Sequence, residues 1–344
     1  MNKLTIIQPD DWHCHLRDDS YLRRTVNDIA LKFGRAIVMP NLVRPITTVA
    51  QAKAYYERIK KHIPTNSKFI PLMTLYLTDT SSVKEIKAAK KSSLIVACKL
   101  YPAGTTTHSQ AGVKSLQKIY PILEVLQSVN LPLLIHGEVI DLNVEIFDRE
   151  AIFIERELIP LLKHFPNLRI ILEHISTKIA VDFITETPVS TLAATITPHH
   201  LWLTQNHLLK GRFYPHYYCL PPLKTRQDQD ALIKAAISGN PKFFLGSDSA
   251  PHSQTTKESA FGAAGIYNSP TAIEIYTELF DRHNRLNKLE GFASRFGAQF
   301  YGLPFNTKKI TLIKQPWQVP KSLSFGPDTV VPLLAGETLN WQLS

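Results

Sequence analysis

The sequence is poor in the features that mark secreted and membrane-embedded proteins. Only three cysteines occur in 344 residues, at Cys14, Cys98 and Cys219. An odd and sparse number argues against a disulfide framework and favours a reducing compartment. No apolar run approaches the ~18 residues that cross a bilayer, and no long apolar stretch precedes Pro9, so we expect neither a membrane span nor a signal peptide. These absences predict a cytoplasmic protein.

Acidic residues are in the minority, with 29 Asp and Glu against 39 Lys and Arg, which gives a formal net charge of +10. The basic residues are scattered, and the small group Lys84, Lys87, Lys90 and Lys91 has the spacing of a solvated helix face. Nucleic-acid binding favours a denser basic stripe with interleaved aromatic residues. We therefore expect no nucleic acid and no membrane as partner; strongly salt-dependent binding to DNA or RNA would reverse that expectation. A positive field can still help to gather an anionic small substrate.

What the sequence does contain is an alternation of short apolar runs and longer helical patterns. Several runs are nearly continuous in aliphatic residues, as strands buried on both faces are. The predicted strands are Leu4–Ile7 continuing into Trp12–Leu16, Ala36–Met39, Ile70–Tyr76, Leu94–Leu100, Leu133–His136, Ile170–His174, Leu192–Ile196 and Phe243–Gly246. The predicted helices are Val49–Lys61, Ser82–Lys91, Val113–Val129, Asp148–His164 with Asp148 as N-cap, Lys178–Glu186, Gln227–Ser238, Pro270–Arg282 and Lys288–Phe296.

About eight strand–helix repeats imply parallel strands joined by right-handed crossovers. The count and the length favour an α/β protein with a closed (β/α)8 TIM barrel over an open doubly wound sheet, although periodicity alone does not separate the two. After Gly302 the chain becomes rich in proline and irregular. We expect residues 302–344 to be a short C-terminal extension packed on the barrel, so that residues 1–344 form a single domain.

Two histidines flank one residue at the end of the first predicted strand. Side chains alternate along a strand, so His13 and His15 share a face while Cys14 faces away, toward the helices. Two imidazoles about 7 Å apart along a strand can converge on one metal ion where the strand ends. Taken alone, such a pair is more often a surface or packing pair than a metal site.

Other predicted strands end in residues that suit the same centre, namely Lys99, His136, His174 and Asp248. Barrel enzymes carry their sites at these carboxyl ends. Each residue alone has an ordinary explanation, such as a hydrogen-bonded core histidine, a helix-capping aspartate, or a lysine whose head reaches water. Together, imidazole and carboxylate groups suit zinc or a similar divalent ion. A charged lysine has no lone pair, but a neutral one beside two dications can add carbon dioxide and form a bridging carbamate.

Ten segments spread over nearly the whole chain carry a wider resemblance: Pro9–Arg17, Ala36–Asn41, Lys99–Pro102, His136–Glu138, Phe147–Glu150, Glu173–His174, Ala193–Pro198, Tyr218–Pro221, Asp248–His252 and Leu334–Glu337. In these segments the chain resembles the dihydroorotases of the shorter, single-function bacterial type, within the amidohydrolase superfamily. The combination is highly specific. It implies a metal-dependent hydrolase barrel with two zinc ions in each subunit of a homodimer.

The resemblance also implies roles for individual residues. One zinc would be held by His13, His15 and Asp248, and the other by His136 and His174. Lys99, as N6-carboxylysine, and a hydroxide would bridge them. Asp248 would be the catalytic base.

Substrate contacts follow from the same resemblance. The substrate carboxylate would be bound by three side chains, Arg17, Asn41 and His252. Main-chain groups of Leu220 and Ala264 would hold the ring. The threonine-rich loop after the fourth predicted strand would be a lid, and Thr106 and Thr107 would reach the substrate.

The implied reaction is the reversible closure of N-carbamoyl-L-aspartate to L-dihydroorotate with loss of water, the third step of de novo pyrimidine biosynthesis. One alternative is another cyclic-amide hydrolase on the same scaffold, a dihydropyrimidinase or an allantoinase, which would not need a carboxylate clamp. A second is a catalytically inactive barrel that serves as a scaffold for partner proteins. Such barrels typically lose metal ligands, whereas all the candidate ligands are present here.

Overall fold

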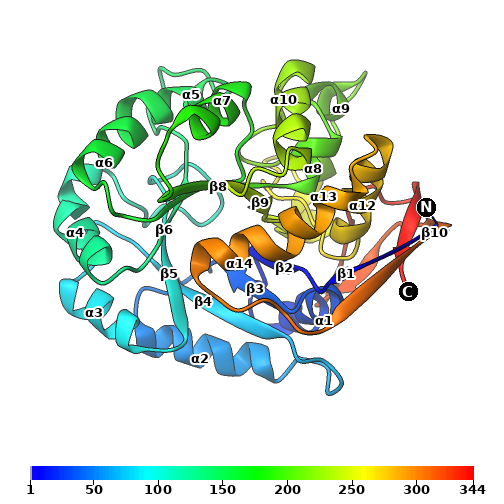
Figure 1. Ribbon diagram of the computed structural model, residues 1–344, viewed down its shortest axis with the longest axis horizontal. Coiled ribbons are helices and arrows are strands. Elements are labelled where there is room, and N and C mark those ends of the chain that lie inside the picture. The colour runs from blue at the N-terminus through cyan, green and yellow to red at the C-terminus, as the bar shows by residue number, and fades with distance from the viewer. Residues whose placement is uncertain (1) are drawn as a thin grey trace.

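An eight-stranded parallel sheet lies at the centre of the computed structural model, which describes residues 2–344. Its strands follow in chain order: β2 (Asp10–Cys14), β3 (Arg35–Val38), β4 (Ile70–Tyr76), β5 (Ile95–Leu100), β6 (Leu133–His136), β7 (Ile170–Glu173), β8 (Leu192–Ile196) and β9 (Phe243–Leu245). The sheet curves into a barrel (Figure 1), and its first and last strands meet at the carboxyl end. There the Asp248 N–H donates to His13 O at 2.8 Å and the His15 N–H to Ser249 O at 2.9 Å. The predicted (β/α)8 barrel is confirmed.

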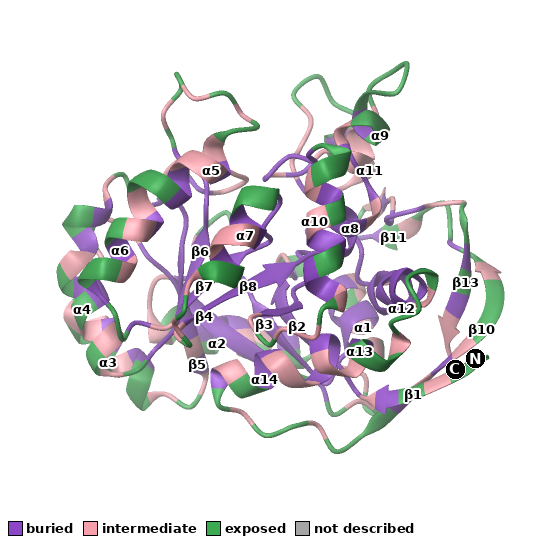
Figure 2. Ribbon diagram, turned by 45° about the horizontal axis from the view of Figure 1, so that its top comes forward, coloured by how far each residue is buried: buried purple, intermediate pink, exposed green. Residues whose placement is uncertain are grey.

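Helices surround the barrel and turn their apolar faces toward it (Figure 2). The longer ones are α1 (Leu22–Lys32), α2 (Val49–Lys60), α3 (Val83–Lys91), α4 (Tyr120–Ser128), α7 (Lys178–Glu186), α10 (Arg226–Ile237) and α12 (Ala272–Arg282). The shorter ones are α5 (Arg149–Phe153), α6 (Ile159–His164), α8 (Pro198–Trp202), α9 (Gln205–Leu209), α11 (Gln254–Lys257), α13 (Leu286–Glu290) and α14 (Phe296–Tyr301). The lysines of α3 are exposed, as a solvated helix face requires. Within residues 2–344, none of these helices is long and apolar enough to span a bilayer.

The core has two layers, one inside the barrel and one between the barrel and the helices. Inside, Trp12 stacks on Tyr301 of α14 with ring centroids 4.7 Å apart, and this pair fills the amino-terminal end of the barrel. Cys14 belongs to the outer layer, where its thiol donates to Ile37 O at 3.4 Å. The predicted outward direction of Cys14 is therefore confirmed.

The C-terminal extension is not irregular, because it forms four strands on the outside of the barrel. Strand β10 (Lys309–Gln318) pairs antiparallel with both β1 (Lys3–Ile7) and β13 (Thr338–Leu343), which places the two ends of the chain side by side (Figure 1). Strands β11 (Leu323–Phe325) and β12 (Asp328–Val330) form a hairpin. Trp341 of β13 is fully buried and donates through Nε1 to Asp281 on α12 at 3.0 Å. The expected packing of this extension on the barrel is confirmed.

Two predicted boundaries are wrong for reasons visible in the backbone. Leu4–Ile7 and Trp12–Leu16 do not form one strand, because the segment around Pro9 separates β1, in the outer sheet, from β2, in the barrel. Residues 113–115 are not helical: the Val113 N–H donates to Tyr101 O at 2.8 Å, and helical turns begin only at the 3-10 helix Leu116–Ile119.

Two further predicted helices are interrupted, and four helices, α1, α8, α9 and α11, were not predicted. A π-helical turn, Ile154–Leu158, lies between α5 and α6, next to Pro160, which lacks the N–H that a regular helix needs. A second π-helical turn, Gly291–Arg295, lies between α13 and α14. Asp148 occupies the expected N-cap position, but its side chain makes no capping hydrogen bond. The amphipathic helix α1 is absent from the predicted set.

Candidate active site

Strands β2 and β9 bring three of the predicted metal ligands together at the carboxyl end of the barrel. Oδ1 of Asp248 lies 3.0 Å from His15 Nε2 and 3.4 Å from His13 Nε2. All three side chains are buried, and their ligand atoms lie within 4.8 Å of one another. Burial lowers the pKa of His15 to about 4 despite the hydrogen bond to Asp248, so this ring is neutral and can offer a lone pair.

Strands β6 and β7 supply a second pair beside the first group. His136 Nδ1 and His174 Nε2 lie 3.3 Å apart, and the ring centroid of His174 lies 5.0 Å from that of His13. Burial, followed by the neighbouring His136, holds the pKa of His174 well below its usual range. Ligand atoms about 2.0–2.1 Å from a tetrahedral zinc lie roughly 3.3 Å from one another. The distances from Asp248 to His13 and His15, and from His136 to His174, are close to that value.

Lys99 of β5 reaches the same end of the barrel, where its Nζ lies 5.0 Å from the centroid of the Tyr101 ring. Its side chain is fully buried, and within the described chain its Nζ makes no hydrogen bond. Burial lowers the pKa of Lys99 to about 8, although Glu173 and Asp248 act in the opposite direction. A buried amine that loses its proton easily and lacks an acceptor fits a nitrogen that carries a carboxylate group. The predicted ligands thus fit a two-metal centre by the chemistry of their donor atoms.

Two buried carboxylates, those of Glu173 and Glu138, orient two of the histidines through the ring nitrogen opposite the proposed ligand atom. Neither glutamate was among the predicted site residues. Oε2 of Glu173 accepts from His13 Nδ1 at 2.9 Å and from Thr195 Oγ1 at 2.5 Å. Glu138 Oε2 lies 2.7 Å from His136 Nε2. Such contacts fix which ring nitrogen carries the proton and leave the opposite nitrogen free for a metal. The sequence held a signal for both, because each glutamate lies within two residues of a predicted histidine ligand.

The predicted carboxylate clamp lies beside the histidines. Arg17 donates through Nε to Pro251 O at 2.8 Å. His252 Nε2 lies 3.0 Å from both Arg17 Nη2 and Ala264 O, and a single ring nitrogen cannot accept from one and donate to the other at once. Burial lowers the pKa of Arg17 to about 10, so the guanidinium remains charged at neutral pH. A cation that faces a neutral ring is suited to an incoming anion.

The predicted lid loop is folded over this end of the barrel. Asn41 Nδ2 donates to Thr107 O at 3.0 Å, and Thr107 Oγ1 donates to Ala264 O at 3.1 Å. The enclosed cavity, which Thr106 and Leu220 also line, has a volume of about 20 Å³. A space of that size holds about one water molecule. An outer cavity of about 670 Å³ shares Arg17 and Asn41 with the inner one.

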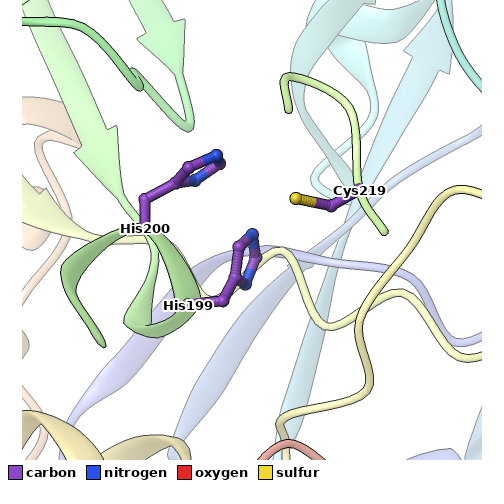
Figure 3. A group of neighbouring side chains, drawn as sticks. All are labelled: His199, His200 and Cys219. Carbon is purple, nitrogen blue, oxygen red and sulfur yellow. The ribbon is translucent and has the colours of Figure 1, made fainter. Parts of the chain in front are cut away.

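A second cluster near the site consists of His199, His200 and Cys219, none of which was predicted. The two histidines extend from α8, and Cys219 reaches toward them from another stretch of chain (Figure 3). Both nitrogens of His200 are engaged, since Nδ1 lies 2.8 Å from the Thr197 hydroxyl and Nε2 lies 3.1 Å from Pro221 O.

His199 has a partner only at Nδ1, because its buried Nε2 makes no hydrogen bond within the described chain. Its Nδ1 lies 3.3 Å from Asn268 Nδ2, and that amide nitrogen also donates to Ser247 O at 2.7 Å, which fixes the orientation of the amide. Nδ1 of His199 is therefore an acceptor, and the proton of the neutral ring stays on Nε2. Neither histidine presents a free lone pair to a metal, so this cluster supports the backbone at Pro221 and is not a third metal site.

Comparison with known proteins gives a consistent picture. No protein-family model matches the chain. The dihydroorotase of Coxiella burnetii (strain RSA 331 / Henzerling II) is 70% identical over 343 residues, which are 100% of this chain and 98% of that protein. The dihydroorotase of Nitrosococcus oceani is 57% identical over 341 residues, or 99% of each chain.

Solved structures agree with these relatives. The crystal structure of dihydroorotase from Campylobacter jejuni has a TM-score of 0.91 at 38% identity and covers 100% of this chain and 98% of its own. Dihydroorotase from Saccharomyces cerevisiae, in complex with 5-fluoroorotic acid, has a TM-score of 0.90 at 34% identity and covers 100% and 99%. The L-hydantoinase of Arthrobacter aurescens has a TM-score of 0.81 at only 16% identity, over 99% of this chain and 83% of that one, which is a likeness of fold alone.

Proposed function

The chain belongs to the dihydroorotase family, and from this premise we propose how its residues perform the reversible cyclisation of N-carbamoyl-L-aspartate to L-dihydroorotate. The observation that carries the proposal is the convergence of the candidate ligands and the Arg17–His252 clamp on one end of the barrel. A dihydropyrimidinase or an allantoinase would act on a ring without a carboxylate and would have no use for that clamp.

The metal centre is proposed as two zinc ions. His13, His15 and Asp248 would hold one ion, His136 and His174 the other, and Lys99, as N6-carboxylysine, would bridge them. Zinc in such a centre lowers the pKa of bound water and polarises a carbonyl group. Glu173 and Glu138 keep the ligand nitrogens of His13 and His136 unprotonated by accepting the protons on the opposite side of the rings.

The substrate is held from two sides. The guanidinium of Arg17 offers a planar pair of donors to the carboxylate that does not react, and Asn41 and His252 complete this clamp. Main-chain groups of Leu220 and Ala264 hold the ring from the opposite side. Both residues line the inner cavity together with the histidines.

Asp248 moves the proton. In the hydrolytic direction a water oxygen forms a bond to the ring carbonyl carbon, and the bond from that carbon to the ring nitrogen breaks. Asp248 accepts the proton from the attacking water and returns it to the leaving nitrogen. Cyclisation reverses each step: the ureido nitrogen attacks the carboxyl carbon, Asp248 takes its proton and delivers it to the departing oxygen, and water is released.

The loop that carries Thr106 and Thr107 acts as a lid. Its closed position depends on the two hydrogen bonds of Thr107, to Asn41 and to Ala264. Both partners are proposed to contact the substrate, so a bound substrate and the closed loop support one another. Closure excludes water and keeps the flexible carbamoyl aspartate near its closing geometry.

We also propose that the chain is a cytoplasmic homodimer and that residues 1–344 fold as one domain. Light scattering in solution gives the number of subunits, and a single unfolding transition in calorimetry is the expected result for one domain. Fractionation of the source cells, with the protein followed by antibody, tests its location.

One set of assays tests the proposed activity. The purified protein is expected to interconvert N-carbamoyl-L-aspartate and L-dihydroorotate, and to act poorly on dihydrouracil and allantoin. Turnover of the neutral rings without turnover of dihydroorotate would make the substrate assignment wrong. Metal analysis addresses the inactive-scaffold alternative, which predicts less than about one zinc per chain, whereas the proposed centre predicts two.

A further inference from the structure

Lys257 is a buried lysine whose hydrogen bonds all go to main-chain carbonyls, and its Nζ also lies 5.8 Å from the centroid of the Tyr218 ring. It ends the short helix α11, and its side chain is 3% exposed. Nζ donates to Tyr218 O at 2.8 Å, to Ala263 O at 2.7 Å and to Gly265 O at 2.8 Å. An ammonium group has three N–H donors, so each of them has a partner.

All three partners are neutral, which is unusual for a buried cation. Burial lowers the pKa of Lys257 to about 7, and the carboxylates of the chain contribute none of its hydrogen bonds. A buried charge without an opposite charge costs free energy unless its hydrogen bonds are complete. The hydrogen bonds of this lysine are complete, so its role depends on what the three bonds hold together.

Those bonds join two segments that are distant in the sequence. One is Tyr218–Pro221, which contains Leu220, and the other is Ala263–Gly265, which contains Ala264. Tyr218 O accepts a second hydrogen bond, from the Gly265 N–H at 3.0 Å, so the two segments are also linked directly. Gly265 has a φ of +146°, and a Cβ there would lie 2.5 Å from Ala250 O, so the second segment is pressed against the end of the barrel.

The main chains of Leu220 and Ala264 are the groups proposed above to hold the substrate ring. The His252 side chain, from the loop that precedes α11, contacts Ala264 O at 3.0 Å. We propose that Lys257 is a positioning residue whose ammonium group clasps the two main-chain segments at the spacing that the substrate ring requires. This inference rests on the proposed function for the identity of the ring, but not for the clasp itself.

The test compares Lys257→Met with a matched control. Methionine has a similar length and volume but no donors, so it leaves three carbonyls without partners. Lys242 offers the control because its Nζ also bridges two carbonyls, Ile184 O and Thr187 O, at the amino-terminal end of the barrel. Lys242→Met removes hydrogen bonds from a half-buried lysine to two carbonyls at the end of α7, far from the site.

For Lys257→Met we expect KM for L-dihydroorotate to rise about ten- to a hundred-fold with a smaller change in kcat, since a misplacement of ~1 Å in a positioning group costs up to that factor. Lys257→Arg keeps the charge and several donors in a different geometry and is expected to lie between. Lys242→Met is expected to lower thermal stability and leave KM unchanged. A wild-type KM in Lys257→Met, or an equal rise in KM in both methionine variants, would overturn the positioning role.

Hydrogen exchange in the substrate-free protein separates this inference from the proposed function. Loss of the clasp is expected to speed exchange of the Gly265 amide, which bonds to Tyr218 O, and not of amides around Lys242. Unchanged exchange at Gly265 in Lys257→Met refutes the clasp. If wild-type protein fails to turn over dihydroorotate, the proposed function fails, while the exchange result still decides whether Lys257 holds the two segments.

Discussion

Glu173 is the most informative residue to change, because it touches no substrate and no metal in the proposed mechanism. It is 1% exposed, and its Oε2 accepts from both His13 Nδ1 and Thr195 Oγ1, while Oε1 has no partner among the described residues. In Glu173→Gln the amide NH2 must take the place of one oxygen. If the NH2 group takes the Oε2 position, His13 Nδ1 and Thr195 Oγ1 both lose their acceptor. If it takes the Oε1 position, it becomes a buried donor without an acceptor, at a cost of about 1–3 kcal/mol.

Either orientation also removes the negative charge that holds the proton of His13 on Nδ1. Contacts of this kind are typically worth about 10- to 100-fold in metal affinity or activity. We therefore expect the free energy of unfolding of Glu173→Gln, measured by urea denaturation, to be lower than that of the wild type by about 1–3 kcal/mol. We also expect this variant to lose metal to a competing chelator at about 10- to 100-fold lower chelator concentration.

A matched control separates stability from metal affinity. Glu150 is also buried at the carboxyl end of the barrel, but its carboxylate accepts only from Ser176 and Thr177. Glu150→Gln is expected to lose stability and retain metal at the wild-type affinity. If Glu173→Gln also retained metal at the wild-type affinity, or if both variants lost it equally, the orienting role of Glu173 would be refuted.

Further outcomes follow from the same structure. Lys99→Ala is expected to lose the paired metal centre, seen by metal analysis, and at least about a hundred-fold of activity; wild-type turnover would contradict the bridging role. Asp248→Ala is expected to lower kcat by about 10²–10⁴-fold while product binding, measured by calorimetry, falls less; an unchanged kcat would exclude the proton transfer. Burial raises the pKa of Cys219 to about 12 and those of Cys14 and Cys98 well above the usual range. Because the reactive thiolate forms only above those values, an alkylating agent is expected to label none of these thiols in the folded protein between pH 7 and 9, and all three in denaturant; rapid labelling of the folded protein would contradict the burial.

The barrel was predictable because its strands appear in the sequence as short, nearly continuous apolar runs. Runs such as Leu133–His136 and Leu192–Ile196 are buried on both faces, so they read as nearly continuous apolar segments, and the structure places strands at those bounds. The predicted ligands sit at strand ends, and parallel strands bring their carboxyl ends together whatever the details of the helices. The grouping of His13 with Asp248, 235 positions apart, follows from that rule alone.

The errors have a different origin. Val113 was assigned to a helix because the apolar spacing from 113 to 129 is helical, but its N–H is taken by Tyr101 O in the base of the lid loop. The π-helical turns arise where the backbone must re-pair around Pro160 or adjust to packing, which apolar periodicity does not encode. In each case a contact made by the main chain outweighed the local pattern.

The same distinction explains which functional residues the sequence conceals. Side chains that contact metal or substrate can be recognised in the sequence, because they are of a few residue types and lie at the ends of predicted strands, as the histidines do. Lys257 and Glu173 act through other groups: one holds carbonyls of residues 218, 263 and 265, and the other holds the far side of a histidine ring. Carbonyls are the same at every position, so the sequence gives no sign of which ones a lysine will meet. Only the folded chain shows that Lys257 lies at the junction of both segments proposed to hold the ring. Loss of its ammonium group is therefore expected to raise KM more than it lowers kcat.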